Sequence, residues 1–152
     1  MYIDYDLRLS KNQAITGSDT STYYVDSVQS GWGANEEVYA RFMVQTAFAG
    51  SASASVTFSI QISQDTAFTT ATTVLSVIKL ASQLTLKNIP LVAKLPVAMM
   101  LSQAGGDSLY SPNTLPYRYV RAYYTVADPV FTVGKITCDL VKDAQTTIDR
   151  AM

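Results

Sequence analysis

The chain has 152 residues, enough for one domain over residues 1–152 that buries about two-thirds of the surface exposed by the unfolded form. Its 11 basic and 12 acidic residues give a formal net charge of −1, which offers no field to attract nucleic acid or an anionic membrane. Charged residues make up only 15% of the chain, against about 25% in ordinary soluble domains. Much of the surface is therefore expected to be uncharged, as in a protein that works against another protein.

Residues suited to catalysis are scarce. The chain has no histidine, which excludes Ser-His-Asp and Cys-His catalysis and most zinc sites. The single cysteine, Cys138, is predicted to be a small buried side chain. Three carboxylate pairs are interpreted as solvated or ion-paired: Asp4 with Asp6, Glu36 with Glu37, and Asp139 with Asp143. We therefore expect no enzyme, no catalytic residue, no metal and no cofactor.

Short strands are predicted almost from end to end. The opening, MYIDYDLRLS, lacks the pattern of a signal peptide, and no apolar run approaches the ~20 residues that a bilayer needs, so neither secretion nor membrane insertion is expected. A turn-rich stretch is predicted from Gln13, and residues 65–71 form a loop with Phe68 tucked inward. Alternating patterns predict strands over residues 2–9, 21–28, 37–48, 55–63, 72–80, 82–86 and 91–95.

The last third of the chain predicts a hairpin. Its two strands lie between Tyr117 and Asp143, and Asp128-Pro129 supplies the turn. Alternation gives the set of inward residues that should form the core: Val56, Phe58, Ile60, Ile62, Val120, Ala122, Tyr124, Val126, Ile136, Cys138 and Leu140.

With Gly, Pro, Asn and Asp between the strands and no sustained helical period, these elements predict an all-β fold. It is an antiparallel two-sheet sandwich of jelly-roll type with about eight strands, and an immunoglobulin-like arrangement is the alternative. The N- and C-terminal strands are expected to pair with each other.

Tyrosine is abundant, with 10 residues in the chain. Neighbours such as Tyr23-Tyr24 and Tyr123-Tyr124 are expected to point to opposite sheet faces. The outward row Tyr117, Tyr119, Arg121 and Tyr123 has the residue types that dominate interface hot spots, although ordinary cross-strand packing explains it equally well. The breaker-rich stretch from Gly105 to Pro116 is a second candidate for binding, through Leu109, Tyr110 and Leu115.

The sequence YVRAYYTVADPVFTVGKITCDLVKDAQ, residues 119–145, resembles the end of the capsid cement proteins of tailed bacteriophages, the Bordetella-phage type. There an R-x-x-Y-T-V strand leads through a short turn to F-T-x-G-K-I/V-T. The opening MYIDYDLRLSKNQAIT is similar to the same family's S-x-x-Q-A-I-T start, and VTFSIQISQDTAFTTATTVL matches its S-x-D-x-x-F turn.

The resemblance implies a jelly-roll cement protein that sits on the outer surface of an icosahedral phage head, after assembly in the host cytoplasm. It would bridge neighbouring major capsid subunits and self-associate as a homodimer or homotrimer, with no direct contact to nucleic acid or membrane. A carbohydrate-binding sandwich module, with Trp32 and Tyr39 as its aromatic platform, is the alternative.

Overall fold

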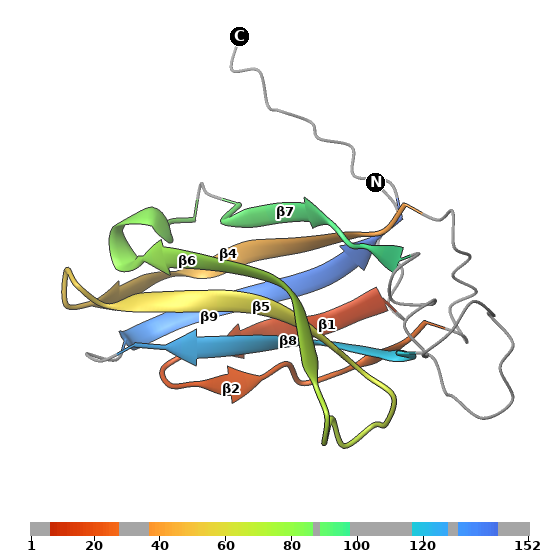
Figure 1. The fold of residues 1–152 in the computed structure, drawn as a ribbon. Helices are drawn as coiled ribbons and strands as arrows, with labels where there is room; N and C mark the ends of the chain where they lie inside the picture. Colours follow the sequence, from red (N-terminus) through yellow and green to blue (C-terminus); the bar gives the residue numbers. More distant parts are fainter. Residues whose placement is uncertain (1–6, 28–36, 87–88, 98–116, 128–130, 143–152) are drawn as a thin grey trace, which may run out of the picture.

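The computed structural model describes residues 7–27, 37–86, 89–97, 117–127 and 131–142, which form two antiparallel sheets packed face to face (Figure 1). The first sheet has the strand order β1-β9-β4-β7, with β1 (Arg8–Ala14), β9 (Phe131–Val141), β4 (Tyr39–Gly50) and β7 (Leu91–Lys94). The second has the order β2-β8-β5-β6, with β2 (Asp19–Thr20), β8 (Tyr119–Val126), β5 (Ser55–Ser63) and β6 (Thr72–Leu80). The short strand β3 (Val25–Asp26) also pairs with β8.

This strand order is that of a jelly roll. The short strands β2 and β3 both pair with β8 and together occupy the position of one interrupted strand, so that the sandwich is built from eight strand positions. Strand β9 lies between β1 and β4, which joins the two ends of the described chain in one sheet. The predicted all-β jelly-roll sandwich and the pairing of its first and last strands are thus confirmed, against the immunoglobulin-like alternative.

The core lies between the sheets and follows the predicted alternation. Every member of the predicted inward set is buried, apart from Val126, which is half-buried against the core. At its centre the rings of Phe42, Phe58 and Tyr124 meet from β4, β5 and β8, with centroid separations of 5.1, 6.2 and 6.0 Å. Most of the stabilisation is expected from this apolar burial.

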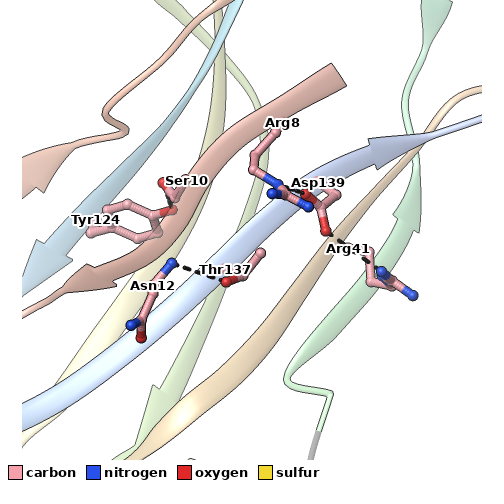
Figure 2. Close-up of polar contacts among 7 residues, drawn as sticks. All are labelled: Arg8, Ser10, Asn12, Arg41, Tyr124, Thr137 and Asp139. Atoms are coloured by element: carbon pink, nitrogen blue, oxygen red, sulfur yellow. Dashed lines mark hydrogen bonds and ion pairs between the residues drawn. The ribbon is translucent and has the colours of Figure 1, made fainter. Parts of the chain in front are cut away.

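A buried polar contact crosses the core and ties the sheets together. The hydroxyl groups of Tyr124 in β8 and Ser10 in β1 are 2.7 Å apart (Figure 2). Because the Ser10 proton goes to Gln13 Oε1 at 2.7 Å, the Tyr124 O–H donates to Ser10 Oγ. The Gln13 amide in turn donates to the Thr20 carbonyl at 2.7 Å, so the chain extends from one sheet to the other without an unsatisfied hydroxyl.

Four predictions are wrong. The two strands that were expected to pair as a hairpin, β8 and β9, lie in different sheets, because β8 pairs with β5 in the second sheet and β9 pairs with β1 and β4 in the first. The turn-rich stretch from Gln13 begins too early, because β9 keeps Gln13 and Ala14 in register opposite Ile136 and Lys135. In place of the predicted strand 82–86, the chain forms the short 3₁₀ helix η2 (Ala81–Gln83). The N–H of the next residue, Leu84, donates to the Ala81 carbonyl, and the Leu84 side chain is buried.

The predicted strand 21–28 is reduced to β3. The Ser21 N–H donates to Ala122 in the second sheet, whereas the Tyr23 N–H donates to Leu9 in the first. A segment bonded alternately to both sheets cannot extend a ladder along either one. In contrast, residues 55–63 and 72–80 form the strands expected from their sequence, and Phe68 is buried in the loop between them.

Candidate interface on the outer face of the second sheet

Strand β8 presents an outward row made of Tyr119, Arg121 and Tyr123. The intervening Val120, Ala122 and Tyr124 are fully buried, as the two-residue period of a strand requires. In the neighbouring strand β5, the residues opposite this row are Ser63, Gln61 and Ser59. These side chains are uncharged, so β5 places no charge directly beside the row.

Arg121 is held in a fixed position at the centre of the row. Its guanidinium lies 4.3 Å from the centroid of Phe68 and 5.8 Å from that of Tyr123, and its Nε donates to Gln61 Oε1 at 2.9 Å. Burial lowers the pKa of this guanidinium from its ordinary value, but the group stays charged because that value is far above neutrality. Arg121 is therefore a cation that is already ordered over an aromatic ring before any partner arrives.

The loop after β5 supplies the ring beneath Arg121. Phe68 adopts a left-handed backbone conformation, with a φ of 55°, and is buried. The Asp65 carboxylate stabilises the loop by accepting from the backbone and side chain of Thr69, both at 3.3 Å, and the Thr69 backbone contact lowers the pKa of that carboxyl. The loop geometry thus places an aromatic ring beside β8.

Tyr24 and Arg118 extend the surface past Tyr119. The Tyr24 ring meets Tyr119 edge to face at 5.6 Å and Phe68 at 6.4 Å. Arg118 lies 5.3 Å from the Tyr119 ring and binds Asp26 through two hydrogen bonds of 2.7 and 2.5 Å, which raise the pKa of the guanidinium. We call the set Tyr24, Phe68, Tyr119, Arg121 and Tyr123 the aromatic face.

The structure places three of the four residues of the predicted row on the outer face of the second sheet. Tyr119, Arg121 and Tyr123 share the outer face as expected, but Tyr117 packs against the hydrophobic core. The prediction fails there because β8 begins at Tyr119, so the strand alternation does not extend back to residue 117. Arg118, which precedes β8, is partly exposed and paired with Asp26. Leu109, Tyr110 and Leu115 lie outside the described residues.

Sequence reasoning missed Tyr24 and Phe68 as parts of the face. Both come from segments without a strand period, and Tyr23 and Tyr24 are both exposed rather than pointing to opposite faces of a sheet. Phe68 was predicted to point inward from the loop over residues 65–71, but that prediction does not reveal which surface side chain covers it. The Tyr123-Tyr124 pair does divide between the two faces as predicted.

The arrangement provides contacts more readily than chemistry. Within the described ranges, no group of three or more Cys, Asp or Glu side chains is placed to hold a metal ion. Burial raises the pKa of the Cys138 thiol well above its usual value, so the thiolate is disfavoured. No helix in the described part of the chain is long and apolar enough to span a membrane.

The fold and the aromatic face define a jelly-roll protein whose candidate site is a contact surface. Residues 9–140 match the Bbp16 family model, and the chain belongs to that family. Bbp16 is the name of a Bordetella phage protein, so this is a phage-associated protein, and the resemblance predicted from the sequence is confirmed at the level of the family. Comparison with curated proteins gives no match.

Proposed function

We propose that the protein is a structural cement protein of a phage head. It binds the outer capsid surface, bridges neighbouring major capsid subunits and so stabilises the shell. The observation that carries this proposal is the aromatic face, in which Arg121 is ordered over Phe68 between two half-buried tyrosines. Membership of a phage protein family supports the same function.

Tyrosine and arginine are suited to this task. Both are enriched among interface residues whose truncation costs at least about 2 kcal/mol of binding free energy. The stacking of Arg121 and its bond to Gln61 reduce the rotamer freedom that binding would otherwise remove. A shell also repeats each contact at many symmetry-related positions, so individually weak contacts can stabilise it together.

The partners in this proposal are the major capsid protein and a further copy of the chain, in a homodimer or homotrimer. The protein acts by binding, without catalytic turnover, and without direct contact to nucleic acid or a membrane. This role needs a folded scaffold with large uncharged surfaces, and the net charge of −1 and the 15% charged residues meet that requirement.

Co-sedimentation with empty phage heads tests the proposal. The double variant Tyr119→Ser with Arg121→Glu should melt close to the wild type, yet its occupancy on heads should fall by about tenfold or more. Lys79→Glu in β6 makes the same charge change away from the aromatic face and serves as the matched control. Wild-type protein that fails to sediment with heads would refute the cement role, whereas full occupancy of the double variant would remove only this face.

The carbohydrate-binding alternative has less support. Trp32, half of its predicted platform, lies outside the described residues, and the Tyr39 hydroxyl is bonded to Glu37 at 3.3 Å. Sugar rings stack on a flat aromatic surface, but Tyr24 and Tyr119 meet at 90° and form no common plane. Binding to a glycan array would favour this alternative over the cement role.

A further inference from the structure

The outer face of the first sheet carries a row of charges across three strands. Asp139 in β9 lies in register between Arg8 in β1 and Arg41 in β4 (Figure 2). Arg8 Nε is 2.9 Å from Asp139 Oδ1, and Arg41 Nη2 is 3.5 Å from Asp139 Oδ2. Asp139 is thus ion-paired, as predicted, and fully buried. Two guanidinium groups thus contact the same carboxylate from opposite sides.

A basic depression adjoins this row. It has a volume of about 430 Å³, and the charged side chains among its described lining residues, Arg8 and Lys11, are both basic. The amide side chains of Asn12 and Gln45 also line it, and Met43 adds an apolar surface. The volume falls within the range of sites that hold small ligands or single side chains, roughly 300–1,000 Å³.

Local backbone geometry shapes the depression and prepares a donor. The pairing of β1 with β9 is irregular between Ser10 and Gln13, and Asn12 there has a φ of 49°. The Asn12 N–H donates to Thr137 Oγ1 at 3.0 Å (Figure 2), which leaves the Thr137 hydroxyl proton available to donate. Thr137 also lines the depression.

Lys135 adds a further cation at the rim. It lies in β9 directly between Ala14 of β1 and Thr46 of β4, and Thr46 is one of the lining residues. Its neighbour Ile136 is buried in the core, so Lys135 projects from the outer face, where it is exposed. Lys11 and Lys135 therefore place two positive charges on one part of a chain whose net charge is −1.

We propose that the basic depression binds a carboxylate-bearing segment of a protein partner. The cations attract the carboxylates, the Thr137 hydroxyl and the Asn12 and Gln45 amides can donate to them, and Met43 can contact the aliphatic part of a Glu or Asp side chain. A nucleic acid fits less well, because a long polyanion needs an extended basic track. The inference goes beyond the proposed function, since it concerns the opposite sheet and its test needs no phage head.

The test is an NMR titration of the ¹⁵N-labelled full-length protein with a peptide of six glutamates. Shift changes should gather on β1, β9 and β4 around the depression, and the affinity should fall when salt is raised from about 50 mM to about 300 mM. The double variant Lys11→Glu with Lys135→Glu should bind at least about tenfold more weakly, since it replaces attraction by repulsion. Lys79→Glu, on the other sheet, should leave the affinity unchanged.

A peptide of six glutamines, a hexathymidine and inorganic phosphate are the comparison ligands. Tighter binding of the glutamate peptide than of all three supports the proposal. It is overturned if the glutamate peptide does not bind, if the glutamines bind equally well, if hexathymidine or phosphate binds as tightly, or if the double variant keeps full affinity. Both lysines are exposed, so the variant should fold; if its spectrum shows unfolding, Lys11→Gln with Lys135→Gln replaces it under the same criteria.

Discussion

Phe58→Ala tests the assignment of the sandwich core. Phe58 is fully buried and contacts Phe42 at 5.1 Å and Tyr124 at 6.0 Å between ring centroids. Removal of a buried phenyl ring costs about 3–5 kcal/mol, and the loss of two aromatic contacts, each worth about 0.5–1.5 kcal/mol beyond area burial, places this site in the upper half of that range. For a chain of this length the melting temperature should fall by about 8–20 °C.

Thermal and urea unfolding followed by circular dichroism would measure the change. Ile78→Ala is the matched control, because Ile78 lies in the neighbouring strand β6 but is 65% exposed, and its loss should change the unfolding free energy by less than about 0.5 kcal/mol. If Phe58→Ala melts within a degree or two of the wild type, or if Ile78→Ala costs as much, the facing assigned to β5 is wrong.

Three further changes test polar and steric features of the sandwich. Asp139→Asn should lower the unfolding free energy by about 3–5 kcal/mol in urea, because it removes the charge of the buried carboxylate that both guanidinium groups contact; a loss under about 1 kcal/mol would mean that these two ion pairs contribute little to stability. Gly134→Ala should cost about 1–3 kcal/mol, since an added Cβ would lie 2.4 Å from the Phe48 ring, and Phe48→Leu should recover part of that cost in the double variant. Burial raises the pKa of the Tyr124 hydroxyl well above its usual 10.0, so the folded state keeps this proton after the unfolded state has released it, and the associated stability is complete below pH 10 and lost above it. Tyr124→Phe should therefore be less stable than the wild type at neutral pH by about 0.5–1.5 kcal/mol. Between about pH 10 and 11 its stability should fall less steeply than that of the wild type, with the two slopes differing by up to about 1.4 kcal/mol per pH unit. Equal slopes for the two proteins would contradict this.

Strands in which inward and outward residues alternate strictly could be predicted, because pairing with neighbouring strands does not change that alternation. Residues 55–63 begin and end as expected, and the alternation in β8 correctly divides Tyr123 from Tyr124. The errors fall where distant segments decide the outcome. Nothing local to Gln13 indicates that β9 will hold it in a strand, and nothing in residues 21–24 indicates that they bond to both sheets.

In the candidate site, too, local periodicity predicted some residues, whereas contacts from distant segments decided the others. Periodicity placed Tyr119, Arg121 and Tyr123 in one row, but it could not place Tyr24 and Phe68, which reach that row from loops. Asp139 was predicted to be solvated or ion-paired, and the structure shows the second of these. Its complete burial could not be predicted, because it depends on Arg8 and Arg41 from two other strands.

The position of β9 between β1 and β4 also determines when the protein can finish folding. Arg8 and Asp139 are 131 positions apart, so the first sheet cannot close until β9 has left the ribosome. Until then β1 and β4 have open edges where β9 will pair, and such contacts between distant segments make folding slow and exposed strands prone to aggregation. The basic depression contains residues from β1, β4 and β9, and therefore exists only in finished molecules. Incomplete chains would lack this surface and could not compete with complete ones for a partner that recognises it.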